Sequence, residues 1–329
     1  MTILVTGSSG HLGEALMRTL LASGRAAVGL DVIPGPFTDE VGSIADRACV
    51  ARCMDGVDTV LHAATLHKPH VATHQREAFV ETNVRGTLIL LEEAARARVQ
   101  AFVMTSTTSA FGDALKPPPG APAAWIDESV APVPKNIYGV TKTAAEDLCR
   151  LFHRNERLST IVLRTSRFFP EEDDDPEARA AYADDNAKTN EYLFRRVAIE
   201  DVVEAHLAAA ERARGIGFGK YIISATTPFK PEDCARLSAD ASPVVSLRAP
   251  GWEAEYARRG WRMFARIDRV YDNALARREL GWRPKWDFAA VVQRLCETGD
   301  IRGPLARQVG AKGYHAEKFP GAPYPVAGS

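Results

Sequence analysis

The chain has little of several features that would place it in a specialised class of protein. Its five cysteines, Cys49, Cys53, Cys149, Cys234 and Cys296, form no C-x-x-C pair, which argues against a disulfide framework or a redox motif. No apolar run is long enough to cross a bilayer. With 41 basic and 42 acidic residues the net charge is −1, so we expect no bulk attraction to nucleic acid or to a membrane. Because the N-terminal stretch lacks the charged and apolar regions of a signal peptide, we expect a cytoplasmic protein.

What the sequence does contain is an alternation of apolar runs with segments of helical periodicity. The expected strands are 3–6, 26–31, 59–63, 101–105 and 160–164, and the expected helices are 11–21, 88–98, 138–155 and 198–213. This alternation predicts an α/β fold with a doubly wound parallel sheet, covered by helices on both faces.

The organisation of the chain changes after the last of these strands. We expect a nucleotide-binding core over 1–165, a small mixed substrate lobe with returning core elements over 166–311, and an irregular tail over 312–329. The proline-rich stretch 116–134 and the acidic stretch 171–185 are predicted to be loops. Within the acidic stretch, 171–175 is more typical of a solvated lid than of a metal site.

A glycine turn follows the first apolar run, in the sequence Thr6-Gly7-Ser8-Ser9-Gly10-His11-Leu12-Gly13. Gly7 permits a tight turn, Gly10 lets the backbone approach a ligand, and Gly13 lets the next helix pack closely. The free N–H groups at the start of that helix favour an anion such as a pyrophosphate. The place of this turn, between a strand and a helix, predicts a dinucleotide site.

Asp31 closes the second expected strand, about 20 residues after the glycine turn, where a dinucleotide fold has its ribose-binding acid. A carboxylate there accepts hydrogen bonds from the ribose hydroxyls and repels a 2′-phosphate, and no arginine follows it at position 32 or 33. NAD is therefore predicted over NADP. The alternative is that Asp31 only caps a turn.

Tyr138 and Lys142 stand four residues apart in Tyr138-Gly139-Val140-Thr141-Lys142, so both side chains share one helix face. A nearby ammonium lowers the pKa of a phenol, which would allow Tyr138 to act as a general acid and base near neutral pH. Hydroxyl residues also gather at 105–109, at the end of an expected strand. That edge of a parallel sheet is where ligands bind.

Together these motifs resemble the extended short-chain dehydrogenase/reductase family of the NAD-dependent epimerase/dehydratase type. The likeness also includes His62-Ala63-Ala64, Asn83-Val84-x-Gly86-Thr87, Val197-x-x-x-Asp201-Val202-Val203 and Leu280-Gly281-Trp282-x-Pro284. The resemblance implies Tyr138 as acid–base, Thr107 as the hydroxyl that orients the substrate oxygen, and Lys142 as ribose ligand. The residues expected to bind NAD are Gly7, Ser9, Gly10, His11, Leu12, Gly13, Asp31, Ser43, Ile44, Ala63, Ala64, Thr65, Asn83, Thr105, Tyr138, Lys142 and Thr165.

The sequence departs from the family pattern where the substrate binds. Thr108-Ser109 follows Thr107, in place of the Asp-Glu pair that dehydratases use to expel water, which argues against dehydration. Arg167 stands where nucleotide-sugar epimerases have an asparagine, and the insertion after it is short. The residues expected to touch the substrate are His67, Thr107, Thr108, Arg167, Arg196 and Arg266.

Two further clusters of residues have side chains that could bind a metal, but in neither cluster is metal binding the favoured interpretation. His67, His70 and His74 could line up on a helix, yet a solvated segment or substrate contact is the more typical role of such a loop. Cys49 and Cys53 have helical i,i+4 spacing, which favours core packing. We therefore predict no metal site.

The resulting functional hypothesis is reversible hydride transfer between NAD and a sugar hydroxyl carbon. A nucleotide-sugar 4-epimerase of the UDP-glucose type is the leading hypothesis. An NAD-dependent dehydrogenase of an unactivated sugar, uronate or hydroxy acid is the main alternative, and a non-catalytic NAD-sensing protein is a remote one. The resemblance also implies a homodimer through the helices that contain 83–98 and 138–155.

Overall fold

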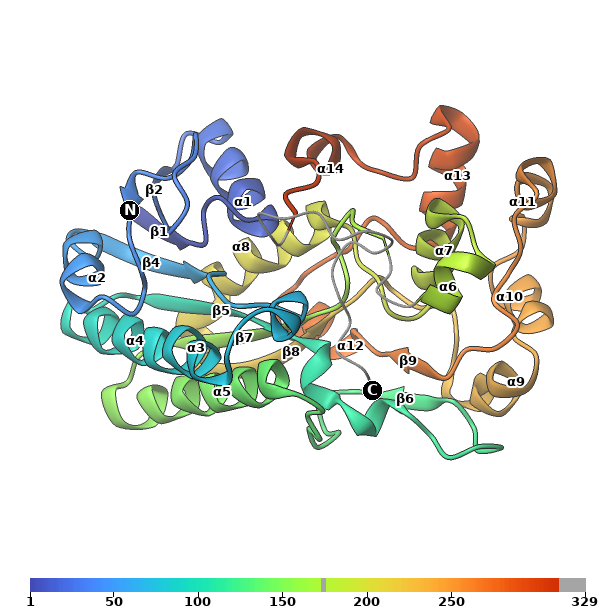
Figure 1. Cartoon of the computed structure of the whole chain (residues 1–329), viewed down its shortest axis with the longest axis horizontal. Coiled ribbons are helices and arrows are strands. Elements are labelled where there is room, and N and C mark those ends of the chain that lie inside the picture. The colour runs from blue at the N-terminus through green and yellow to red at the C-terminus, as the bar shows by residue number, and fades with distance from the viewer. Residues whose placement is uncertain (173–175, 314–329) are drawn as a thin grey trace.

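A parallel sheet with helices on both faces forms one part of the protein, and a group of short elements lies beside its strand ends (Figure 1). The computed structural model describes residues 1–172 and 176–313. The seven sheet strands are β1 (Thr2–Thr6), β2 (Ala26–Asp31), β3 (Glu40–Val41), β4 (Val57–His62), β5 (Ala101–Thr107), β7 (Thr160–Thr165) and β8 (Phe218–Ile223). Their order is β3-β2-β1-β4-β5-β7-β8 and every pairing is parallel. This is the doubly wound α/β fold that the sequence predicts.

Side chains alternate between the two faces along each strand, so they pack into two separate cores, one on each face of the sheet. Ile3 and Val5 of β1 point to one face and Leu4 points to the other. Strand order reverses between β1 and β4, and such a switch point opens a crevice for ligands outside the carboxyl ends of the strands.

Two helix layers cover the sheet. The first layer is α1 (His11–Ala22), α8 (Ile199–Ile216), α12 (Ala274–Glu279) and α14 (Pro304–Val309). The second is α2 (Arg47–Cys53), α3 (Arg76–Phe79), α4 (Thr87–Arg96) and α5 (Ile137–Glu156), with the π-helical turn η2 (Val80–Gly86) between α3 and α4. In Figure 1 α1 and α8 lie above the sheet and α4 and α5 below it.

The smaller lobe has a core of its own. Phe194, Trp252, Tyr256 and Phe288 are buried together there. Its elements are α6 (Pro176–Ala181), α7 (Asp184–Glu191), α9 (Cys234–Ala239), α10 (Ser242–Arg248), α11 (Glu253–Arg259), α13 (Phe288–Thr298), and the parallel pair β6 (Ala124–Ile126) and β9 (Arg269–Tyr271). The remaining short turns are η1 (Lys68–Ala72), η3 (Thr108–Phe111), η4 (Asp113–Leu115) and η5 (Pro231–Asp233).

Several local expectations were wrong. The stretch 116–134, predicted to be all loop, contains β6, because Ala124 pairs with Arg269 far along the chain. The acidic stretch contains α6 and the start of α7, whereas residues 173–175 lie outside the described residues. The expected tail 312–329 is described only as far as residue 313. Short strands such as β3 were missed since their pairing partners, not their own periodicity, define them.

Candidate active site

The glycine turn connects β1 to α1 and is held by its own backbone. Gly7 has φ +75°, and its N–H donates to the Leu30 carbonyl at 2.8 Å. A Cβ on Gly13 would lie 1.8 Å from the Gly7 carbonyl oxygen, so only glycine fits there. Gly10 caps α1 without a side-chain hydrogen bond, which leaves the N–H groups of the first helical turn for an anion.

Asp31 lies at the end of β2 and supports this turn. Its carboxylate accepts the N–H of Ser9 at 2.9 Å and the N–H of Ile33 at 2.9 Å. The Ser9 hydroxyl in turn donates to the Ile33 carbonyl at 2.9 Å. The acid expected to hold the ribose is thus also a turn cap, and its position is fixed by the glycine turn itself.

The second half of the site lies at the start of α5. The Asn136 side chain caps this helix by accepting the Gly139 N–H at 3.0 Å, which places Tyr138 in the first turn. Tyr138 and Lys142 are 6% and 3% exposed, and Thr107 at the end of β5 is 8% exposed. The Thr107 hydroxyl is hydrogen-bonded to Tyr138 and accepts the Ser109 N–H at 3.0 Å.

The electrostatics of Tyr138 differ from the expectation that Lys142 lowers its pKa. Burial raises the pKa of Tyr138 to about 12, and the hydrogen bond with Thr107 offsets part of that rise. Burial also lowers the pKa of Lys142 to about 8, against the attraction of Glu146. The net shift of the Tyr138 pKa is therefore upward, because burial disfavours the charged phenolate.

A buried ion network fixes the same face of α5 against the sheet. Glu146 is fully buried and accepts hydrogen bonds from Ser106 at 2.6 Å, Arg164 at 2.6 and 3.0 Å, and Lys220 at 3.0 Å. These partners come from β5, β7 and β8. Since Glu146 follows Lys142 by one helical turn, the network sets the rotation of the helix that carries the tyrosine–lysine pair.

His67 reaches the site from the loop after β4. Asn83 shapes that loop by accepting the Leu66 N–H at 2.8 Å and the Thr65 hydroxyl at 2.9 Å. The His67 ring lies 6.2 Å from the Tyr138 ring, centroid to centroid. Burial first, and then His70 and Lys142, lower the pKa of His67 to about 3, so its imidazole is neutral at pH 7.

Three arginines share one buried carboxylate on the cavity wall. Glu191, 1% exposed, pairs with Arg167 at 2.9 Å, Arg195 at 2.8 Å and Arg196 at 2.9 Å. Arg167 and Arg196 also form a bridge between their backbones. Guanidinium groups such as these suit an anionic ligand.

A carboxylate lies beside the glycine turn. Glu171 is paired with His11 at 2.8 Å and accepts backbone N–H groups of Lys312 at 3.2 Å and Gly313 at 3.3 Å. Burial opposes ionisation of Glu171, but the His11 hydrogen bond outweighs it and the pKa of Glu171 is lowered. A negative charge therefore stands at the start of α1, next to the expected anion site.

One cavity of about 780 Å³ joins these parts. Of the expected residues it is lined by Gly7, Gly10, His11, Leu12, Gly13, Ala63, Thr65, His67, Thr105, Thr107, Thr108, Tyr138, Thr165, Arg167 and Arg196. The lining does not include Ser9, Asp31, Ser43, Ile44, Ala64, Asn83 and Lys142. The exposed Arg266 does not line it, and Arg269 of β9 does.

Several wall residues were not among the predicted site residues. Glu171, Glu191, Phe169 and Arg269 line the cavity but have no motif around them. The only local signal for Glu191 is its proximity to Arg195 and Arg196 in sequence, which does not reveal that it is buried.

A doubly wound sheet with a glycine turn at β1, a tyrosine over the same cavity and a lysine one helical turn further along α5 define a nicotinamide-dependent oxidoreductase of the short-chain type. Comparison with known proteins identifies the particular family. Residues 3–223 match the sequence model of the NAD dependent epimerase/dehydratase family, and the chain belongs to that family. The predicted family and its NAD cofactor are thereby confirmed.

Individual relatives match the chain at low sequence identity. A UDP-glucose 4-epimerase of Erwinia amylovora is 27% identical over 182 residues, which cover 50% of this chain and 52% of that enzyme. The chain spans about half the length, 40% and 52%, of the first curated relatives that it matches.

Solved structures share the fold over most of the chain. A short-chain dehydrogenase/reductase superfamily protein of Agrobacterium tumefaciens with bound NAD superposes with a TM-score of 0.62 at 23% identity, covering 91% of this chain and 99% of that one. UDP-glucuronic acid 4-epimerase of Bacillus cereus, in complex with UDP-glucuronic acid and NAD, gives 0.61 at 20% identity, covering 89% and 97%. Across residues 1–172 and 176–313, we find no helix with the length and apolarity that a membrane span needs.

Proposed function

We propose that the chain is an NAD-dependent 4-epimerase of a nucleotide sugar, which oxidises a sugar hydroxyl carbon and reduces it again on the opposite face. The observation that carries this proposal is the single cavity in which Tyr138 and Thr107 stand beside the glycine turn. The names of the relatives, a UDP-glucose 4-epimerase and a UDP-glucuronic acid 4-epimerase, support the substrate class.

The residues at the glycine turn fit a dinucleotide. The uncapped start of α1 at Gly10 offers N–H groups to the pyrophosphate, and the missing Cβ of Gly13 lets helix and turn approach each other. Asp31, at the end of β2, would accept the ribose hydroxyls. When bound, NAD accepts a hydride from the sugar carbon and returns it.

Residues of the chain itself would transfer the proton of the substrate hydroxyl. The Tyr138 phenolic oxygen Oη would take the proton from the substrate hydroxyl as the carbon is oxidised and give it back on reduction. The Thr107 hydroxyl, already hydrogen-bonded to Tyr138, would hold the substrate oxygen in line. The Lys142 ammonium favours the phenolate. The His67 ring beside the tyrosine is neutral and therefore adds no charge to the site.

The arginine cluster favours a second candidate, an NAD-dependent dehydrogenase of a small anionic sugar such as a uronate. Arg167, Arg195 and Arg196 all pair with the Glu191 carboxylate and line the cavity. Their guanidinium groups could bind a carboxylate on the sugar directly, without a nucleotide. In that case the ketone product leaves and NADH is released.

One experiment separates the two candidates. Protein loaded with NAD is incubated separately with UDP-glucose, UDP-glucuronic acid and free glucuronate, while NADH absorbance and sugar isomers are followed. The epimerase proposal predicts an isomerised nucleotide sugar without net NADH. Net NADH from free glucuronate, without an isomer, would replace it with the dehydrogenase. Neither product from any of the three sugars would contradict both.

We also propose a homodimer through α4 and α5. Val140 and Leu151 on α5 are 48% and 42% exposed, and pairing of this helix with a second copy would cover them. Sedimentation of the purified protein tests this, and a monomer at micromolar concentration would refute it.

A further inference from the structure

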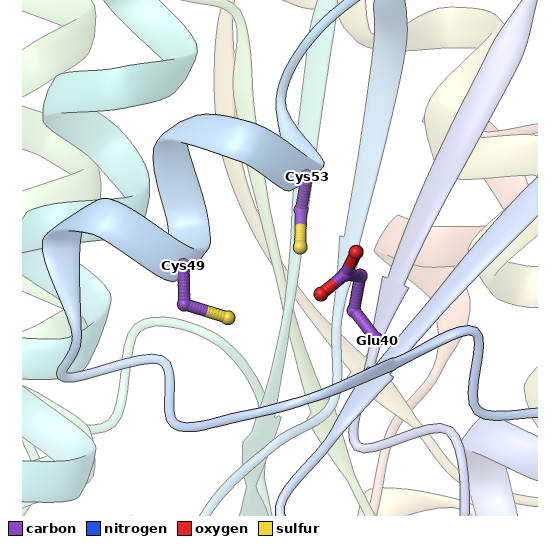
Figure 2. Close-up of side chains that lie close together, drawn as sticks. All are labelled: Glu40, Cys49 and Cys53. Atoms are coloured by element: carbon purple, nitrogen blue, oxygen red, sulfur yellow. The ribbon is translucent and has the colours of Figure 1, made fainter.

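Two thiols and a carboxylate meet at the edge of the sheet, outside the cavity described above. Cys49 and Cys53 lie one turn apart on α2, and Glu40 begins β3. The two Sγ atoms and a carboxylate oxygen of Glu40 all lie within 4.8 Å of one another. Figure 2 shows the three side chains pointing into one common space. The sequence spacing alone predicted only core packing for the two cysteines, because nothing in it indicates that Glu40 joins them.

The local backbone holds this arrangement. The Asp46 side chain caps α2 by accepting the Ala48 N–H at 2.9 Å, which fixes the rotation of the short helix. Gly42 makes room for the first thiol, since a Cβ there would lie 2.4 Å from the Cys49 Sγ. The Cys49 thiol therefore lies against the backbone that directly follows β3.

The cluster is buried on its sulfur side and open on its oxygen side. Cys49 and Cys53 are 2% and 5% exposed, whereas the Glu40 side chain is 43% exposed. An ion can therefore enter past Glu40, and a water molecule could complete the coordination there. The Arg52 guanidinium lies 3.7 Å from the Glu40 carboxylate. Two thiolates and one carboxylate carry three negative charges, which a divalent cation and Arg52 would balance.

We propose that Cys49, Cys53 and Glu40 form a binding site for a thiophilic divalent cation of the zinc class. Two sulfur ligands and one oxygen ligand, with an open fourth position, are a donor set that such ions accept. Bonds of about 2.3 Å to sulfur and about 2.1 Å to oxygen require the ligand atoms to draw together slightly. Rotation about the Glu40 side chain can supply most of that movement.

Binding the ion changes the protonation of the thiols. Each cysteine gives up its S–H proton to solvent as its metal–sulfur bond forms, so two protons leave for each divalent ion bound. The desolvated Cys53 thiol, whose pKa burial raises to about 12 with a further contribution from Cys49, is protonated in the metal-free protein.

The site would connect α2 to β3 next to the cofactor edge. Directly after β3 the Gly42 N–H donates to the Asp31 carbonyl at 2.8 Å, and Ser43 and Ile44 follow. An ion held by Glu40 and the two cysteines would therefore stiffen the turn that leads to these residues. This inference does not depend on the proposed function, because it concerns residues outside the cavity.

Cadmium titration of the full-length protein tests the site. Protein treated with chelator and kept reduced with a phosphine is titrated with Cd²⁺, and the ultraviolet sulfur-to-cadmium charge-transfer band is recorded. We expect a band that saturates at one equivalent, together with a rise in the melting temperature. Cys49→Ala and Cys53→Ala should each remove the band. Glu40→Gln, on the open side, should weaken Cd²⁺ binding by about tenfold or more.

The exposed Cys296 provides the matched control. Cys296→Ala should leave the band and the stoichiometry unchanged. Circular dichroism verifies that the two buried substitutions fold, and Glu40→Gln keeps the test valid if they do not. Absence of a band in the wild-type protein, an undiminished band in Cys49→Ala or Cys53→Ala, or unaltered affinity in Glu40→Gln would overturn the proposal.

Discussion

The structure bears most directly on the energetics of proton transfer by Tyr138. Burial raises the pKa of Tyr138 to about 12, with partial relief from the Thr107 hydrogen bond. At pH 8 only about one Tyr138 side chain in ten thousand is then a phenolate, which corresponds to a cost of about 5 kcal/mol. For turnover near neutral pH, positive charge in the loaded site must offset most of this cost. Lys142 and the oxidised nicotinamide are the two sources of positive charge that we expect there.

The perturbation that isolates the contribution of Lys142 is Lys142→Met, which removes the charge and keeps most of the volume. We expect the rate near pH 7.5 to fall by about 10²-fold to 10³-fold. Because the tyrosine then ionises at higher pH, the rate should rise again as the pH increases. Tyr138→Phe has no proton to move, so its rate should fall by about 10²-fold to 10⁴-fold at every pH.

The assay is the initial rate of product or NADH formation as a function of pH for both variants and the wild type. Lys142→Arg, which stays charged, serves as the control and should keep the wild-type profile. NAD titrations establish that each variant still binds the cofactor. A Lys142→Met profile with the wild-type pH dependence, or wild-type turnover by Tyr138→Phe, would refute the reasoning.

Three further substitutions test other parts of the structure. Gly13→Ala places a Cβ 1.8 Å from the Gly7 carbonyl oxygen. NAD binding should therefore be lost, and the free energy of unfolding should fall by about 2 kcal/mol. A titration that gave the wild-type dissociation constant for NAD would show that the turn tolerates a side chain. Glu171→Gln removes the negative charge at the start of α1 and should tighten NAD binding by about fivefold at low salt, roughly 1 kcal/mol. Unchanged or weaker NAD binding in calorimetry would contradict repulsion between Glu171 and the pyrophosphate. Burial raises the pKa of Asp201 to about 6, against its backbone hydrogen bonds with Lys285 and Trp286, so its contribution to stability is full below its unfolded pKa of about 3.9 and lost as the pH rises through 6. The difference in unfolding free energy between wild type and Asp201→Asn should therefore change by up to about 3 kcal/mol between pH 4 and pH 7.5; urea titrations at both values would contradict this if the difference stayed constant.

Residues whose roles depend on local backbone were predictable from the sequence. The glycine turn, the capped start of α5 and the strand periodicities are each set by neighbouring residues. Gly7, Gly10 and Gly13 consequently fall on the cavity wall, as does Tyr138. The i,i+4 spacing likewise placed Lys142 on the helix face of Tyr138.

Features that depend on distant partners were not predictable. Arg266 and Arg269 lie three residues apart, and only the pairing of β9 with β6 decides that Arg269 reaches the cavity. Glu191 pairs with Arg167 from the chain segment after β7, which the backbone bridge between Arg167 and Arg196 holds beside it. The pKa of Tyr138 depends on how much of the side chain is desolvated, and sequence spacing contains no information on burial.

Hydride transfer inside one cavity is the central claim, and a deuterium-labelled sugar tests it most directly. NAD-loaded wild-type protein is mixed in a stopped-flow instrument with UDP-glucose, UDP-glucuronic acid or glucuronate, each with and without deuterium at the carbon to be oxidised. With at least one sugar we predict an NADH absorbance, transient or lasting, that forms more slowly from the deuterated form. Tyr138→Phe should still bind NAD and should form NADH at least about 10²-fold more slowly. No NADH with any of the three sugars, or an equal signal from Tyr138→Phe, would contradict the account.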